Sequence, residues 1–114
     1  MTETRAEVML GTLDLMVLKL LEAGPVHGWG LAQLLETASD GTFCVNQGSI
    51  YPALQRLKAK GLVRSRWGVS ENGRRARYYE LTRPGLKELG KEVANWVRTS
   101  SAVNRVLAFD GGEV

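Results

Sequence analysis

The segment at residues 46–63, NQGSIYPALQRLKAKGLV, constrains the fold of this chain more than any other stretch. Its apolar residues recur with the spacing of one face of an amphipathic helix: Ile50, Ala53, Leu54 and Leu57. The opposite face carries side chains that can contact a phosphate, a sugar or a base edge: Ser49, Tyr51, Pro52, Gln55, Arg56 and Lys58. Gly61 can end the helix in a left-handed conformation, with Leu62 folding back onto the last turn. Such a helix can lie in a DNA major groove; the alternative is a surface helix whose charged face is merely solvated.

The chain has 114 residues, the length of one domain, and its 44% hydrophobic residues suffice for a small core. No apolar run reaches the length of a membrane span and no signal peptide opens the chain, so we predict a cytoplasmic protein without a membrane partner. One cysteine, Cys44, and one histidine, His27, are too few for an internal disulfide or a usual zinc site. We therefore expect no metal and no cofactor.

Positive charge is concentrated in one part of the chain. The formal net charge is +3, whereas residues 56–83 carry nine Arg and Lys against Glu71 and Glu80, a local charge of +7. Subtracting +7 from +3 leaves −4 for the rest of the chain. A basic block inside an otherwise acidic chain most often binds nucleic acid.

A first helix is predicted from the N-terminal pattern. Residues 4–7 fit a capping box, so the helix begins near Thr4, with Thr12 as the fallback because Gly11 weakens its continuity. One apolar stripe comprises Leu10, Leu13, Val17, Leu20 and Leu21. A second stripe, on another face, comprises Val8, Leu15 and Leu18. We interpret the second stripe as a subunit contact; the alternative is a central helix buried on both sides.

Residues 23–25, Ala-Gly-Pro, end that helix, and residues 26–30 form a turn into a second one. The core face of the second helix is predicted to comprise Leu31, Leu34, Leu35 and Ala38. His27 is assigned a capping or packing role in preference to pH sensing or catalysis.

The approach to the third helix is less regular. Phe43 and Val45 have the alternation of a very short strand. Either Asn46 or Ser49 caps the third helix. Because proline is tolerated near a first turn, Pro52 favours the Ser49 cap or a locally irregular start of the helix.

A β-hairpin follows, with residues 62–67 and 77–81 as its strands. Asn72 and Gly73 between them are a turn signal. The tip is cationic, and its arginines can reach a phosphate backbone or a minor groove: Arg74, Arg75 and Arg77. The alternative is a solvated loop that happens to carry three arginines.

Thr82 caps a final helix, with Pro84 in its first turn. Its apolar residues follow a heptad seam, in which Ser100 is the weak member: Leu86, Leu89, Val93, Trp96, Ser100, Val103 and Leu107. At about 1.5 Å per residue such a helix is roughly 37 Å long, too long for so small a domain to cover. We therefore expect the same helix of a second subunit to cover it. Residues 109–114 are predicted to fray.

Three helices, a hairpin and a long helix give a mainly α fold with a small β-hairpin: a winged helix-turn-helix plus a C-terminal dimerisation helix. The chain resembles the short members of the PadR family of bacterial transcriptional regulators. The matching segments are LGTLDLMVLKLL at 10–21, PVHGWGLA at 25–32, QGSIYPALQRLKAKGLV at 47–63, WGVSENGRRARYYELT at 67–82, and Pro84-Gly85. On this reading residues 1–82 form the DNA-binding domain, 83–108 the dimerisation helix and 109–114 the tail.

The resemblance implies that the third helix enters the major groove, that the wing contacts the backbone, and that the fourth helix pairs with the first helix of the partner. The expected recognition-helix contacts are Gln47, Ser49, Tyr51, Pro52, Gln55, Arg56 and Lys58. The expected wing contacts are Asn72, Arg74, Arg75 and Arg77. The expected dimer interface comprises Val8, Leu15, Leu18, Leu86, Leu89, Val93, Trp96, Ser100, Val103 and Leu107.

The resemblance also implies a role for Trp96. In some short family members an aromatic residue on the last helix lines a cavity between subunits that holds flat hydrophobic ligands. A candidate effector pocket thus comprises Leu15, Trp96 and Ser100, where the indole can stack on a planar molecule. The alternative is that Trp96 simply fills the dimer seam. Trp29 and Trp67 are assigned to packing in the core or the wing.

The predicted function is a dimeric repressor that binds a palindromic operator in double-stranded DNA and is released by a small hydrophobic or aromatic effector. One alternative is a winged-helix protein-interaction module. Another is a thiol-responsive regulator acting through Cys44, although the sequence places no cationic pair near it. We do not expect an enzyme, because the sequence contains no nucleophile with a base, no phosphate loop and no paired carboxylates.

Overall fold

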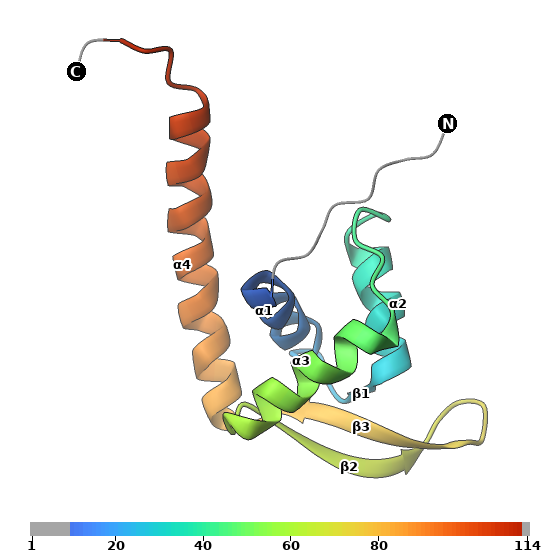
Figure 1. The fold of residues 1–114 in the computed structure, drawn as a ribbon. Helices are drawn as coiled ribbons and strands as arrows, with labels where there is room; N and C mark the ends of the chain where they lie inside the picture. Colours follow the sequence, from blue (N-terminus) through green and yellow to red (C-terminus); the bar gives the residue numbers. More distant parts are fainter. Residues whose placement is uncertain (1–9, 113–114) are drawn as a thin grey trace, which may run out of the picture.

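The computed structural model describes residues 10–112. Within that range the chain forms four helices and one antiparallel sheet (Figure 1). The helices are α1 (Leu10–Leu20), α2 (Gly28–Ala38), α3 (Gln47–Ala59) and α4 (Arg83–Leu107). The strands are β1 (Val26–His27), β2 (Val63–Val69) and β3 (Arg75–Leu81), in the order β1-β3-β2. Helices α1 to α3 form a compact body on the sheet and α4 stands to one side, so the winged helix-turn-helix prediction is confirmed.

One hydrophobic core joins α1, α2, α3, the sheet and the first part of α4. The first apolar stripe of α1 contributes to it through Leu13, Val17 and Leu21. Leu18, predicted in a subunit contact, is instead only 2% exposed within the chain. The prediction for Leu18 is therefore wrong, and α1 is buried on two sides because α4 covers its second face.

Two other predicted interface positions, Leu89 and Leu15, pack in or against the core of the single chain. Leu89 is only 4% exposed and belongs to the core, so it is not available to a partner. Leu15 is half-buried and packs against the same core. Val8 and the predicted helix start near Thr4 lie outside the described residues.

The segment before α2 contains a strand that the sequence did not indicate. Val26 pairs with Tyr79 and His27 with Tyr78, which adds β1 to the expected hairpin and makes a three-stranded sheet. His27 also caps α2, because its Nδ1 accepts a hydrogen bond from the Gly30 N–H at 3.0 Å. The capping role predicted for His27 is confirmed.

The core face of α2 is narrower than predicted. Leu31 and Leu35 are buried, whereas Leu34 is 41% exposed and Ala38 is exposed. The strand predicted around Phe43 and Val45 does not form. These two side chains instead pack onto the core from the loop between α2 and α3.

Helix α3 begins and ends through local hydrogen bonds. Asn46 is its N-cap and accepts the Ser49 N–H at 3.2 Å, so the preference for a Ser49 cap is wrong. Pro52 lies inside the helix, which therefore forgoes one backbone bond. At the other end Gly61 has φ +75 and the Leu62 N–H donates to the Leu57 carbonyl at 3.0 Å, a Schellman motif as predicted.

We expect Asn46→Ala to lower the free energy of unfolding by about 1 kcal/mol, because the side-chain bond at the start of α3 is lost. Urea denaturation followed by circular dichroism measures the change. Asn95→Ala, at an exposed site on α4, is the matched control and should not destabilise the protein. Equal losses in both variants would show that Asn46 does not cap the helix.

The hairpin runs further than predicted. Its strands pair from Val63 opposite Leu81 to Val69 opposite Arg75, and the loop between them spans only residues 70–74. The Asn72-Gly73 turn is confirmed, with Gly73 at φ +75. Because β3 lies between β1 and β2, it carries the one buried tyrosine of the described sheet, Tyr79.

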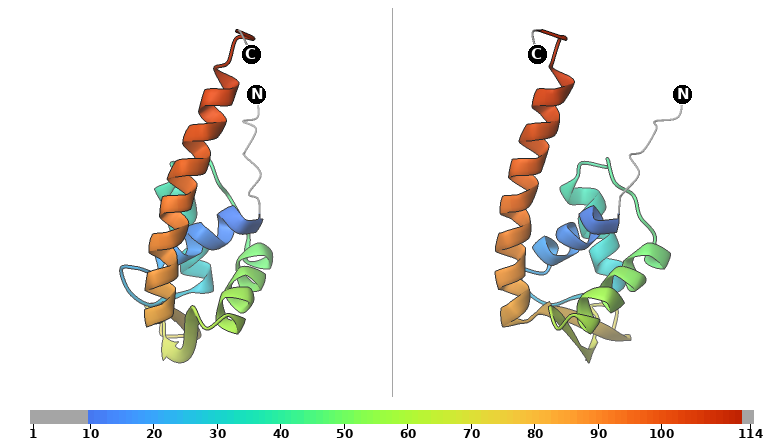
Figure 2. Two further views of the ribbon diagram at one scale, coloured as in Figure 1. Left: turned by 90° about the vertical axis from the view of Figure 1, so that its left-hand side faces the viewer. Right: turned by 60° about the vertical axis from the view of Figure 1, so that its left-hand side comes forward.

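Helix α4 begins as predicted. Thr82 Oγ1 accepts the Gly85 N–H at 3.1 Å and its hydroxyl donates to the Gly61 carbonyl at 2.7 Å, which ties α4 to the end of α3. Beyond its first turns α4 extends past the body of the protein (Figure 2). The seam residues outside the core are exposed, apart from half-buried Ser100: Leu86, Val93, Trp96, Val103 and Leu107. Residues 109–112 of the predicted tail lie outside α4, and 113–114 outside the described range.

None of the helices in the described part of the chain is both long and apolar enough to span a membrane.

Candidate nucleic-acid interface

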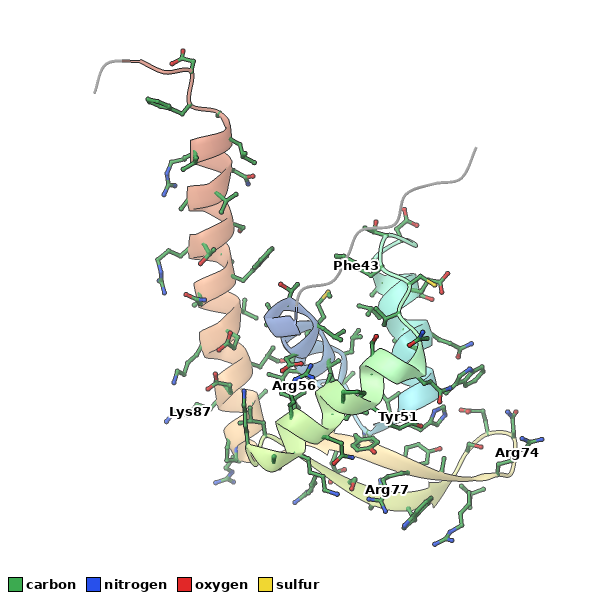
Figure 3. All side chains as sticks on the ribbon, in the orientation of Figure 1. Phe43, Tyr51, Arg56, Arg74, Arg77 and Lys87 are labelled. Carbon is green, nitrogen blue, oxygen red and sulfur yellow. The ribbon has the colours of Figure 1, made fainter. Side chains whose placement is uncertain are left out.

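A groove of about 760 Å³ separates α3 from the hairpin, which we call the wing. Three of the predicted recognition residues line it: Gln47, Tyr51 and Gln55. All four predicted wing residues line it as well: Asn72, Arg74, Arg75 and Arg77. Figure 3 shows Tyr51 and Arg77 on facing elements, with Arg74 near the tip of the wing. Residues from two separate segments therefore converge on one surface.

The other predicted residues of α3 lie differently. Ser49, Pro52 and Lys58 are exposed on the helix but do not line the groove. Arg56 is partly buried between α3 and α1, where its Nη2 and Nε donate to the two oxygens of Asp14 at 2.7 and 3.2 Å. That hydrogen bond raises the pKa of Arg56 above its ordinary value. The Arg56 guanidinium is therefore occupied by an ion pair inside the chain.

Tyr51 is held against the start of α2. A Cβ atom built at Gly28 would lie 2.8 Å from its Cζ, so only glycine allows the ring to approach that closely. The phenol lines the groove together with His27 and Trp29.

A contact between His27 and Glu71 ties the wing to α2. Because His27 Nδ1 accepts from Gly30, the proton lies on Nε2, which donates to Glu71 Oε1 at 3.1 Å. This bond lowers the pKa of the Glu71 carboxyl below its ordinary value. Glu71 is the one acidic residue among those that line the groove, and it keeps a negative charge beside the wing arginines.

Trp67 lies in the groove next to the wing arginines, although the sequence assigns it only to packing. The guanidinium carbons of Arg75 and Arg77 lie 4.4 and 4.8 Å from its ring centroid. The predicted packing of Trp67 in the wing is confirmed. The sequence did not predict that Trp67 would also line the groove. The register of the hairpin, which sets Trp67 opposite Arg77, is the signal that could have found it.

The candidate effector residues do not meet within one chain. Leu15 lines a cavity of about 160 Å³ between α1, α3 and α4, together with Glu88 and Glu92 but without Trp96 or Ser100. Trp96 lies further along α4 and is 48% exposed. Cys44 is exposed, and its hydrogen-bonding partner is the Glu36 carboxylate, 3.6 Å away, rather than a cation.

The profile of the transcriptional regulator PadR-like family matches residues 17–91. A PadR-like regulator from Bacillus cereus is 32% identical, with a TM-score of 0.73 over 90% of this chain and 95% of that one. A transcriptional regulator from Clostridium thermocellum is 26% identical, with a TM-score of 0.75 over 83% and 89% of the two chains. An uncharacterised protein of Lysinibacillus sphaericus is 23% identical over 88% of this chain and 92% of its own length.

The matched profile covers more than half of the chain, and it includes α2, α3 and the whole wing. The groove between α3 and the wing lies within the matched region, and it collects the amide and guanidinium groups that DNA-binding proteins use. By sequence and by fold, this chain belongs to the PadR-like family of DNA-binding transcriptional regulators.

Proposed function

We propose that this protein is a homodimeric, sequence-specific repressor that blocks a promoter by occupying a palindromic operator. The observation that carries the proposal is the groove between α3 and the wing. Two glutamines line it on the α3 side and three arginines line it on the wing side. In this arrangement α3 enters the major groove while the wing follows the adjacent backbone.

The groove residues divide into two roles. Gln55 reads a base, because its amide can bond adenine N6 and N7 together, and Gln47, Ser49 and Tyr51 add contacts to base edges. Lys58 and the wing arginines bind phosphates, with Asn72 beside them, so affinity falls steeply with salt. Pro52 contributes an apolar contact at the helix surface. Arg56, which the sequence places among the DNA contacts, instead holds α3 against α1 through its ion pair with Asp14.

The exposed seam of α4 supports the dimer. Leu86, Val93, Trp96, Val103 and Leu107 leave a long apolar row uncovered in the single chain. A second α4 would cover this row and present two α3 helices to half-sites about one DNA turn, roughly 34 Å, apart.

An effector would act at the same seam. Trp96 offers an exposed indole for a planar hydrophobic molecule, and two subunits would bring Leu15 of one near Trp96 of the other. Binding weakens operator affinity only if the ligand prefers the arrangement of the two heads that does not fit the operator. The alternative remains that Trp96 only fills the seam.

The DNA-binding proposal is tested with two groove variants. A preferred site is first selected from a randomised duplex pool, and affinities are then measured for that site, for single-base variants and for a scrambled duplex. Gln55→Ala should lose about 10-fold in discrimination at one adenine position, because one bidentate contact is removed. Arg74→Ala should weaken all duplexes alike and lower the salt slope by about one.

Lys87→Ala is the matched control for charge. Lys87 is exposed near the start of α4, at the opposite end of the molecule from the wing tip that carries Arg74 (Figure 3), so its loss should leave the salt slope unchanged. If Lys87→Ala reduces the slope as much as Arg74→Ala, the groove is not the DNA-binding surface. If the selected and scrambled duplexes bind equally, the protein is not sequence-specific.

A further inference from the structure

Trp67 lines the groove, and the proposed DNA contacts give it no role. It lies on β2 directly opposite Arg77 and is 52% exposed. Two cations stack on it: Arg75 and Arg77 both place their guanidinium groups over the indole, with carbon-to-centroid distances of 4.4 and 4.8 Å. An exposed indole covered by two arginines is a specific arrangement on the surface that faces α3.

The backbone explains why both arginines reach one ring. Side chains alternate between the two faces of a strand, so Arg75 and Arg77 share a face of β3. The register sets Trp67 opposite Arg77 on the neighbouring strand, with Arg75 on the diagonal. Arg77 is held further because its Nη1 donates to Ser65 Oγ at 3.2 Å. Two flexible side chains are thus restrained before any DNA is present.

Stacking leaves the arginines free to bind. A guanidinium stacks through its flat face and donates hydrogen bonds through its edge, so one arginine can cover an indole and still hold a phosphate. A side chain that is already ordered also loses less freedom when it binds. A free arginine side chain samples many rotamers, so stacking lowers the entropy cost of binding for each of the two side chains.

We propose that Trp67 is a positioning residue, which holds Arg75 and Arg77 as a preformed pair of anchors for the DNA backbone. The inference rests on the proposed function, since it assumes that these two arginines contact phosphates. On this proposal, Trp67 raises the affinity of the wing for DNA without contacting DNA itself.

The decisive experiment is a double-mutant cycle on duplex binding. Trp67→Leu should weaken both the selected and the scrambled duplex roughly 5- to 30-fold, because two arginines must now be ordered on binding. Trp67→Tyr, which keeps an aromatic face, should recover most of that loss. In a protein that already carries Arg75→Gln and Arg77→Gln, Trp67→Leu should have almost no further effect.

A measurement on the free protein isolates the positioning from the binding. In Trp67→Leu, NMR order parameters of the Arg75 and Arg77 Nε–H groups should fall, while that of Arg74, which is not stacked on the indole, stays unchanged. Arg66→Gln is the matched control for charge. Arg66 precedes Trp67 on β2, so its side chain lies on the opposite face of the sheet, near Glu80. Removing the charge of Arg66 should therefore not alter the salt slope.

The outcomes separate the two proposals. If the two arginine substitutions do not weaken duplex binding, the wing contacts in the proposed function are wrong. If they do weaken it, the positioning role alone fails in either of two cases. In the first, Trp67→Leu keeps its full effect in the protein that carries Arg75→Gln and Arg77→Gln; in the second, it leaves the arginine order parameters unchanged. Thermal unfolding of each variant shows whether a loss of binding reflects a loss of fold.

Discussion

Replacing Gly85 by alanine should lower the free energy of unfolding by about 2–3 kcal/mol, although alanine normally stabilises a helix. Gly85 lies in the first turn of α4 and is buried against the turn that follows α3. A Cβ atom built there would lie 2.0 Å from the Leu62 carbonyl oxygen and 3.2 Å from Leu81 Cδ2. Because the closest obstacle is backbone, no side-chain rotation relieves the clash.

The local structure makes that backbone hard to displace. Leu62 is fixed by its bond to the Leu57 carbonyl, and its own carbonyl accepts the Thr82 N–H at 3.1 Å. Moving α4 away would also strain the Thr82 hydroxyl bond to Gly61. A domain of this size has only about 5–15 kcal/mol of stability, so the loss should appear as a fall of roughly 10 °C or more in the unfolding temperature.

Gly90→Ala is the matched control for Gly85→Ala. Gly90 lies in the same helix and is exposed, and a Cβ atom built there would meet nothing within 4 Å beyond its own helix backbone. Alanine there should therefore stabilise the protein by about 0.5–1 kcal/mol. Both variants are compared in urea at one protein concentration, since association changes apparent stability. If both substitutions shift stability in the same direction, α4 does not approach Leu62 as closely as described.

The parts of the fold that the sequence predicted well are those set by local chemistry. Gly61 ends α3, Thr82 and Pro84 start α4, and Asn72-Gly73 turns the hairpin. Each of these signals depends on the conformation or the hydrogen bonds of a few adjacent residues. The amphipathic pattern of α3 also predicted its buried face correctly, because all four of its predicted apolar residues are buried.

The features that the sequence did not predict depend on contacts between distant residues. β1 is only two residues long, so it has no periodicity that a sequence could show. It forms because its backbone pairs with β3. Asp14 and Arg56 lie 42 positions apart in the sequence, so no local pattern predicts their ion pair. An apolar stripe shows that a helix face will be covered but not by what, which is why the sequence alone places Leu18 and Leu89 at a dimer interface.

Substituting Val93 by aspartate should convert the proposed dimer into a monomer. Val93 lies in the α4 seam and is 41% exposed in the single chain, so a partner helix has side-chain surface there to cover. A carboxylate in the middle of an apolar interface would be desolvated without a partner. We expect the dimer dissociation constant to rise at least 100-fold, measured by sedimentation equilibrium.

The same substitution should reduce operator affinity far more than it reduces binding to scrambled DNA. Two linked heads bind a palindrome as a chelate, and the linkage contributes on the order of 10²–10⁴ in affinity. Val93 does not line the groove, so each head keeps its own contacts with DNA. A loss of two or more orders of magnitude on the operator, with a small loss on scrambled duplex, is the expected result.

Ala94→Asp introduces the same charge one residue away and serves as the control. A step of one residue turns the side chain by about 100° around the helix, which takes it off the seam and four positions before Arg98. This variant should remain dimeric and bind the operator normally. If Val93→Asp is also dimeric, the subunits associate through another surface and α4 is not the dimerisation helix. If it is monomeric yet binds the operator as tightly as before, the two heads act independently and a palindromic site would give no advantage.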